Sequence, residues 1–326
     1  MYAKKKFRLL MIIRNCFLLI IAIILIWFIF HQVMNLYEKK HYSPIGKRFN
    51  IEEYNMHVYM KGEGENTIVL LPGLGTAAPA LDFQPLVEEM SKDNRVIVVE
   101  PFGYGWSDMT NKERTVENIV EEIRLALQKA NIEGPYILMP HSISGIYSMY
   151  YANKYPDEVN AVIGIDATLP KATQYFSEDV PTMPKFMRYV APTGLARIAL
   201  YIEPDDYLPL AEDGTYSKEN LQNTKAISAR KAYNKNVVNE ANEIKNNIDK
   251  TNHMSFPTDM PVLFFAAKKD KVNAEGKTNV TFYQTQLTKF PTSKIVTLEG
   301  HHYLHWTHYK EMSDEVNEFL VSINAN

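Results

Sequence analysis

The sequence predicts an α/β fold in which a mostly parallel sheet carries helices on both faces, an inserted helical lid and an N-terminal transmembrane helix. The first observation is that short apolar runs alternate with helix-like segments over most of residues 48–323. Such alternation is typical of a parallel sheet covered on both faces. The second is a break in this alternation over residues 168–258, and the third is an apolar run near the N-terminus, over residues 16–34.

The N-terminal run is long enough to cross a membrane as a helix. A span requires ~20 helical residues, and residues 16–34, interrupted only by His31 and Gln32, nearly suffice. Bulky or polar residues follow, rather than a small-residue cleavage site. A membrane anchor through residues 16–34 is therefore favoured over a cleaved signal peptide.

Basic residues flank both ends of this run. Five precede it and four follow it: Lys4, Lys5, Lys6, Arg8 and Arg14, then Lys39, Lys40, Lys47 and Arg48. Cytoplasmic flanks of membrane helices carry the excess of Lys and Arg. The small excess of basic residues before the run predicts a cytoplasmic N-terminus and an extracytoplasmic body. We therefore expect a single-pass protein of the cell membrane.

The body begins after a short polar linker, and its apolar periodicity predicts the elements in order. We expect a hairpin (48–61), a strand (67–71), a helix (79–91), a strand (95–100), a helix (115–130), a strand (135–139), a helix (142–154), strands (161–165 and 261–266), a helix (279–287), a strand (294–298) and a closing helix (309–323). Residues 168–258 are helical and polar-aromatic, without a clear strand. We therefore expect a cytoplasmic stub and anchor (1–36), a core in two parts (37–167 and 259–326) and a lid between them (168–258).

Composition excludes several classes of function. The 326 residues carry a net charge of −3 and no basic stretch in the body, so there is no electrostatic footprint for nucleic acid. Cys16, the one cysteine, lies in the apolar run, which leaves the body without a disulfide or a thiolate metal site. No cofactor is implied.

Ser142 occupies a position suited to a nucleophile, between a strand and a helix in residues 135–148. The strained turn that exposes such a serine requires compact residues two positions to either side. With Ser142 as nucleophile these are Pro140 and Ser144, whereas Ser144 as nucleophile would place bulky Ile146 there. We therefore predict Ser142.

Three motifs resemble those of the α/β-hydrolase superfamily. Residues 140–145, Pro-His-Ser-Ile-Ser-Gly, resemble its Gly-His-Ser-x-Gly-Gly elbow, with both flanking glycines replaced. Residues 71–75 resemble its oxyanion loop, with Pro72 in place of histidine, and residues 100–108 resemble its Asp-x-x-Gly-x-Gly-x-Ser segment, with Glu100 in place of aspartate. The resemblance is closest to the lidded esterase and prolyl-aminopeptidase-like branches, and implies a serine hydrolase.

The catalytic partners are predicted from chain order, which in this fold is serine, acid, histidine. Asp270 ends a strand and is the expected acid; Asp166, at the end of the preceding strand, is the alternative. Resemblance to the family's Gly-His-aromatic-x-His pattern selects His302 as the base, with His301 as the alternative. The oxyanion would be bound by the backbone N–H groups of Leu74 and Ile143.

Three other interpretations fit parts of the sequence. A dinucleotide-binding oxidoreductase is suggested by residues 73–78, which fit Gly-x-Gly-x-x-Ala, but Pro79 interrupts the following helix. A zinc site is suggested by His301 and His305, four residues apart, but no third ligand is evident and no metal is expected. A hydrolase fold that binds a ligand without catalysis is the third.

We expect the substrate to be a small carboxylic ester or amide, cleaved through an acyl-enzyme on Ser142. Lid side chains would either line an apolar pocket above Ser142 or form the lid's own core: Tyr175, Phe176, Met183, Phe186, Met187 and Tyr189. Charged lid residues would either select the substrate or remain on the surface: Arg188, Arg197, Glu203, Asp205 and Asp206. Glu203 or Asp205 would suit the amino terminus of an aminopeptidase substrate.

Overall fold

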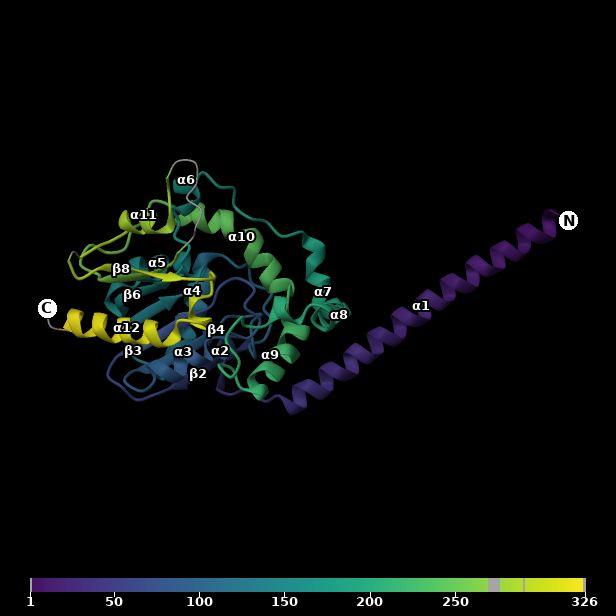
Figure 1. Ribbon diagram of the computed structural model, residues 1–326, viewed down its shortest axis with the longest axis horizontal. Coiled ribbons are helices and arrows are strands. Elements are labelled where there is room, and N and C mark those ends of the chain that lie inside the picture. Colours follow the sequence, from purple (N-terminus) through teal and green to yellow (C-terminus); the bar gives the residue numbers. More distant parts are fainter. Residues whose placement is uncertain (1, 269–275, 290, 325–326) are drawn as a thin grey trace.

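The computed structural model describes residues 2–268, 276–289 and 291–324, and its described strands form one eight-stranded sheet (Figure 1). The strand order is β1-β2-β4-β3-β5-β6-β7-β8, with β2 antiparallel to β1 and β4 and the other pairs parallel. The strands are β1 (Lys47–Ile51), β2 (Tyr54–Lys61), β3 (Thr67–Leu71), β4 (Arg95–Glu100), β5 (Tyr136–Pro140), β6 (Val159–Ile165), β7 (Val262–Lys268) and β8 (Lys294–Glu299). The predicted mostly parallel α/β sheet is confirmed.

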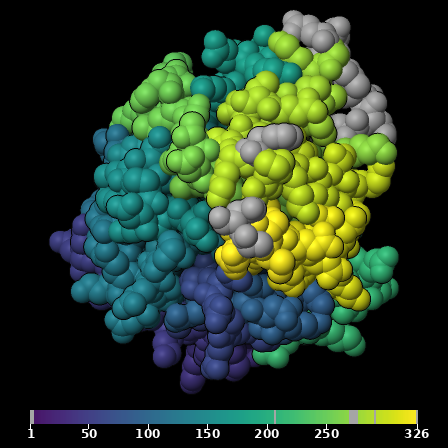
Figure 2. Space-filling view, turned by 90° about the vertical axis from the view of Figure 1, so that its left-hand side faces the viewer, coloured from purple at the N-terminus to yellow at the C-terminus, as the bar shows by residue number. Residues whose placement is uncertain are grey.

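Helices cover both faces of the sheet, as predicted. Alternate residues of a strand point to opposite faces, so Val69 and Leu71 of β3 belong to one buried cluster and Ile68 and Leu70 to another. The first cluster lies beneath α4 (Val116–Lys129), α5 (Ser144–Lys154) and α11 (Asn279–Gln284). The second lies beneath α3 (Gln84–Met90) and the closing helix α12 (Tyr309–Asn324), which occupies the face seen in Figure 2.

The helix expected over residues 79–91 is two helices, and that expectation was wrong. Helix α2 (Pro79–Asp82) ends at Phe83, and α3 begins at Gln84 with Pro85 in its first turn. Proline lacks the N–H that a continuous helix would use there, and is tolerated only in the first turn. The break therefore falls just before Pro85.

The chain between β6 and β7 contains helices and no strand, and every residue from 168 to 258 has a described backbone. We call residues 168–258 the lid segment. Its elements are α6 (Ala172–Phe176), the 3-10 turn η2 (Lys185–Tyr189), α7 (Val190–Thr193), α8 (Leu195–Ile202), η3 (Pro204–Tyr207), α9 (Lys218–Lys231) and α10 (Lys235–Thr251).

Buried side-chain amides join α10 to the core. The amide of Asn236 accepts a hydrogen bond from the N–H of Thr110 (3.1 Å) and donates one to its carbonyl (3.0 Å). Asn247 likewise accepts from the N–H of Val116 (2.7 Å) and donates to the carbonyl of Arg114 (3.1 Å). Removing either amide would leave backbone groups unpaired in a buried interface, which costs about 1–3 kcal/mol each.

A buried carboxylate reinforces the same interface. Glu240 of α10 accepts hydrogen bonds from the hydroxyls of Tyr104 and Tyr147, each at 2.8 Å. Burial raises the pKa of Glu240 above its usual range, because desolvation disfavours the charged form. The carboxylate is held by two tyrosines of the core, so α10 is fixed relative to the sheet.

The N-terminal helix α1 (Tyr2–His41) is longer than the predicted span and projects away from the sheet (Figure 1). Residues Lys4–His41 have a mean hydropathy of 2.9 in their most apolar window. Among the described residues, this is the helix that is long and apolar enough to cross a bilayer. Basic Lys39 and Lys40 lie in its last turn.

Gly103 permits the close approach of the core to α10, and we predict that Gly103→Ala destabilises the protein by about 3 kcal/mol. Its φ of +95° strains any other L residue, and an added Cβ would lie 2.6 Å from the Cβ of Asn236. Gly214→Ala is the matched control, since Gly214 has a similar φ of +89° but no atom within 4 Å of an added Cβ. Thermal unfolding of the purified full-length protein should show the larger loss for Gly103→Ala; equal losses would refute the steric argument.

Candidate active site

Ser142 lies in a strained turn at the carboxyl end of β5. Its φ is +51°, a left-handed conformation that costs about 1–3 kcal/mol for a non-glycine residue. Hydrogen bonds on both sides hold this conformation: the Ser142 N–H donates to the carbonyl of Ile165 (3.2 Å), and the Ser142 carbonyl accepts from Thr168 (2.8 Å). The serine therefore protrudes between β5 and α5.

Crowding around this turn explains which neighbours must be small. A Cβ on Gly145 would lie 2.5 Å from the carbonyl oxygen of Thr168. The hydroxyl of Ser144 is buried and donates a hydrogen bond to the carbonyl of Pro72. Ser144 is thus engaged in holding the loop after β3, whereas Ser142 faces a cavity.

His302 and Asp166 form a hydrogen-bonded pair beside the turn. His302 Nδ1 lies 2.6 Å from Asp166 Oδ2. The carboxylate accepts, so Nδ1 carries the proton and Nε2 is left as a potential base. Asp166 Oδ1 accepts from the amide of Asn279 (2.8 Å) and the N–H of Ala267 (3.3 Å). These bonds orient the 4% exposed carboxylate toward the imidazole.

The remaining predicted residues are placed differently. Asp270, the acid expected from the sequence, lies outside the described residues, and the acid that contacts His302 is the alternative, Asp166. The ring of His301 is stacked on Tyr303 and Trp306, with centroids 5.6 Å away in both cases. His301 is exposed, its Nδ1 accepts a hydrogen bond from the N–H of Tyr303 (3.2 Å), and it lines a second cavity.

Two backbone N–H groups are available for an oxyanion. In the described chain, the N–H groups of Leu74 and Ile143 donate no hydrogen bond to another protein group. Both residues line the cavity that contains Ser142. Unpaired donors beside a nucleophile are the arrangement that stabilises a tetrahedral oxyanion.

His141 is buried beside His302 and remains neutral. Burial, with the nearby rings of His305 and His302, holds the pKa of His141 well below its usual 6.5. Its Nε2 lies 3.2 Å from the carbonyl of His302, and the two rings are 4.7 Å apart. His141 therefore positions the His302 loop without placing a positive charge next to it.

A cavity of about 500 Å³ brings these groups together. Ser142, Ile143, Leu74, Asp166 and His302 all line it. Apolar side chains form much of the remaining wall: Phe176, Ile244, Ile248, Val280 and Phe282. A volume of this size suits a small organic substrate.

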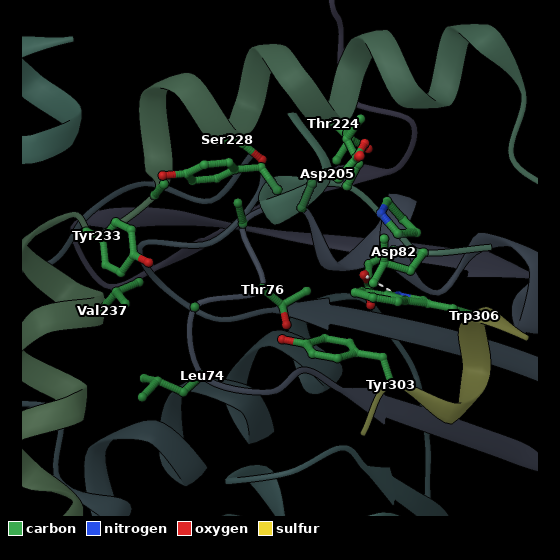
Figure 3. Close-up of a pocket in the computed structure, with 18 of the residues that line it drawn as sticks. Leu74, Thr76, Asp82, Asp205, Thr224, Ser228, Tyr233, Val237, Tyr303 and Trp306 are labelled. Atoms are coloured by element: carbon green, nitrogen blue, oxygen red, sulfur yellow. Dashed lines mark hydrogen bonds between the residues drawn. The ribbon is translucent and has the colours of Figure 1, made fainter. Parts of the chain in front are cut away.

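A second cavity of about 430 Å³ lies beneath α9 (Figure 3). The hydroxyls of Thr76 and Tyr303 face each other on its wall, with Tyr233 opposite (Figure 3). Asp82 forms part of the floor, where it accepts hydrogen bonds from His305 (2.7 Å) and Trp306 (2.9 Å). Leu74 lines both cavities.

The rival sites are not assembled. Among the residues described, no cluster of three or more His, Cys, Asp or Glu could hold a metal, and His305 is instead bonded to Asp82. Glu100, which a dinucleotide would use at the end of the second strand, is fully buried and pairs with His57 (2.9 Å). It also accepts from the N–H groups of Ala80 and Trp106, so it cannot reach a ribose.

Sequence reasoning misplaced several lid side chains. Phe176 lines the Ser142 cavity and Met183 lines the second one, but Phe186 and Tyr189 are exposed and belong to neither a pocket nor the lid's core. Arg197 is neither a substrate selector nor a surface charge, because it is buried against Glu38 of α1. The sequence could not indicate the Arg197–Glu38 ion pair, because it depends on how α1 packs on the lid segment.

Comparison with known proteins supports the same architecture. Residues 66–309 match the model of the alpha/beta hydrolase fold. The uncharacterized protein YbdG of Bacillus subtilis (strain 168) is 31% identical over 283 residues, covering 84% of this chain and 85% of that protein. The serine hydrolase BPHL of Mus musculus is 29% identical over 117 residues, which cover 33% of this chain and 38% of that protein. The crystal structure of the epoxide hydrolase VrEH1 from Vigna radiata superposes with a TM-score of 0.64 at 15% identity, covering 84% and 96% of the two chains.

We predict that His141 makes stability depend on pH. Because its folded pKa lies below that of the unfolded chain, the unfolded state binds more protons as pH falls through about 6.5. The free energy of unfolding should therefore decrease from neutral pH downward, and less steeply in His141→Asn. The measurement is thermal unfolding between about pH 8 and pH 5.5, with His141→Asn compared with His253→Asn, which replaces an exposed histidine. Identical slopes in wild type and His141→Asn would contradict this prediction.

Proposed function

The chain belongs to the α/β-hydrolase family, and we propose that it is a membrane-anchored serine hydrolase that cleaves a carboxylic ester or amide through an acyl-enzyme on Ser142. The observation that carries the proposal is that Ser142 and the His302–Asp166 pair line one cavity, with two unpaired N–H groups beside them. Nucleophile, base, orienting acid and oxyanion donors are the parts that acyl transfer requires.

The proposed mechanism has two steps. His302 Nε2 takes the proton of Ser142 as the serine oxygen attacks the carbonyl carbon, and the oxyanion accepts hydrogen bonds from the N–H groups of Ile143 and Leu74. His302 then returns that proton to the leaving alcohol or amine, which leaves the acyl group on Ser142. In the second step water, deprotonated by His302, releases the acid. Asp166 fixes the imidazole tautomer and stabilises the imidazolium.

The walls of the cavity favour an ester with an apolar acyl group. Phe176, Phe282 and Ile248 line it, and burial of apolar surface contributes about 25 cal/mol per Å² to binding. Glu203 and Asp205, the acids considered for an aminopeptidase, are absent from this lining, whereas two other acids of the lid segment, Glu178 and Asp179, belong to it. We rank esterase activity first because of the apolar wall, and a panel of acyl esters and aminoacyl amides compares the two activities.

Anchoring through α1 and the cell-membrane location are part of the proposal. The length and apolar character of Lys4–His41 support a span. The excess of basic residues before the span supports a catalytic domain outside the cytoplasm.

Labelling with a fluorophosphonate probe tests the nucleophile. We expect wild type to be labelled and Ser142→Ala to be unlabelled, because only a serine with an adjacent base attacks phosphorus rapidly. Ser144→Ala is the matched control, since it removes the other serine of the turn, and should remain labelled. An unlabelled wild type that is folded would favour a hydrolase-like protein that only binds its ligand.

Substitution of the two candidate acids tests which one orients His302. We expect Asp166→Asn to lower kcat by about 10³- to 10⁴-fold, because an amide oxygen and nitrogen no longer enforce the productive tautomer. Asp270→Asn should change kcat by less than about 10-fold. The measurement is steady-state hydrolysis of a short-chain ester, and the reverse ranking would assign the acid role to Asp270.

A further inference from the structure

Helix α8 is apolar on almost every side, although one side is exposed. Its sequence, Leu195–Ile202, contains one charged side chain, Arg197, which points inward and is 4% exposed. Leu195, Tyr201 and Ile202 are exposed by 52%, 66% and 68%. A surface helix of a water-soluble domain normally carries polar residues on its outer side. The apolar outer side of α8 therefore indicates contact with something other than water.

The exposed apolar residues cluster along one stretch of chain. Outside α1, the described residues include eight large apolar side chains that are exposed, and six of them lie between 186 and 210. We call these six the lid apolar face: Phe186, Tyr189, Leu195, Tyr201, Ile202 and Leu210. Apolar groups scattered singly over a surface need no explanation, but a concentration of this kind marks an interaction site.

Helix α8 is clamped to α1 by a buried ion pair. The guanidinium of Arg197 contacts both carboxylate oxygens of Glu38, at 2.5 and 2.8 Å. It also bonds Asn35 (3.0 Å) and the ring of His31 (3.2 Å). The position of the lid apolar face along α1 is therefore fixed by directional bonds.

Close backbone packing extends this contact into the apolar part of α1. A Cβ on Gly194 would lie 2.7 Å from the His31 ring and 2.9 Å from Nε1 of Trp27. Trp27 and His31 fall within the span 16–34, whereas Glu38 lies beyond it. The lid thus contacts α1 where the apolar run ends, and Figure 1 shows α7 and α8 beside that part of the helix.

We propose that the lid apolar face lies in the interfacial layer of the same bilayer that α1 spans. The proposal rests on the anchoring role of α1 put forward above. If α1 crosses the bilayer, its clamp to α8 sets the face at the depth where the span emerges. Tyr189 and Tyr201 are of the residue type enriched at that depth, where an aromatic ring is apolar at one end and hydrated at the other.

This placement also identifies a class of substrate. The second cavity is lined by Asp205, Tyr207 and Leu210, which follow α8, and Leu210 belongs to the lid apolar face. Leu74 lines both this cavity and the one that contains Ser142. The mouth of the second cavity thus lies at the bilayer surface, and the fitting substrate is an amphiphilic ester dissolved in the membrane.

Spin labels on the full chain in phospholipid vesicles test the contact. With Cys16→Ser as background, single cysteines are introduced by Ile202→Cys, by Leu19→Cys in α1 and by Val321→Cys. Val321 is the matched control, being 70% exposed against 68% for Ile202, but α12 lies on the face shown in Figure 2, away from α1. We expect the label at 202 to be several-fold less accessible than that at 321 to a water-soluble nickel complex, and more accessible to oxygen.

The outcomes separate the two proposals. Equal nickel accessibility at 202 and 321, with the label at 19 shielded, overturns the lid contact and leaves the anchor intact. A label at 19 open to nickel overturns the anchor itself. A label at 202 shielded from both nickel and oxygen indicates a protein neighbour, and also overturns the bilayer contact.

Activity measurements test the class of substrate. We expect Ile202→Asp to lower hydrolysis of a long-chain ester dissolved in vesicles several-fold, and to leave hydrolysis of a water-soluble short ester unchanged. Ile202 lines neither cavity, and Val321→Asp is the control that should affect neither reaction. If Ile202→Asp hydrolysed both esters at the wild-type rate, or lost activity equally on both, the assignment of a membrane-dissolved substrate would be overturned.

Discussion

The close approach of three chain segments at the carboxyl end of β5 is the constraint on which the site depends. A Cβ on Gly73 would lie 2.7 Å from the His141 ring, and one on Gly145 would lie 2.5 Å from the carbonyl of Thr168. The loops after β3, β5 and β6 meet here because those strands are neighbours and parallel. Parallel strands bring their carboxyl ends to one edge of a sheet, where ligands bind. The turn at Ser142 and the carboxylate of Asp166 are thus juxtaposed by the strand order itself.

Two helices of the lid segment are fixed by contacts with different parts of the protein. Helix α10 is joined to the core through buried amides and Glu240, which leaves it few alternative positions. Helix α8 is joined to α1 through Arg197 and Glu38. A buried ion pair contributes little net stability but strongly penalises the loss of one partner. It is therefore better understood as specifying where α8 lies than as a source of stability.

Much of this arrangement could be predicted from the order of residues along the chain. The strands, the turn at Ser142 and the pairing position of His302 follow from local apolar patterns and short motifs. The acid that contacts His302 could not be singled out in this way, because Asp166 and Asp270 both follow predicted strands, and the bonds of Asp166 to His302, Asn279 and Ala267 join distant segments. Contacts between distant segments, such as Arg197 with Glu38, 159 residues away, carry no local pattern at all.

The ion pair between α1 and α8 has a practical consequence for how the protein can be studied. A fragment beginning after His41 would leave Arg197 and Arg230 without Glu38, which lies within 4 Å of both. It would also uncover Gly194 and Ala191, which are buried in the presence of α1. Such a fragment would present two guanidinium groups without a carboxylate partner amid apolar surface, and would be prone to self-association. Helix α1 is therefore an integral part of the folded body, and the intact chain is the appropriate material.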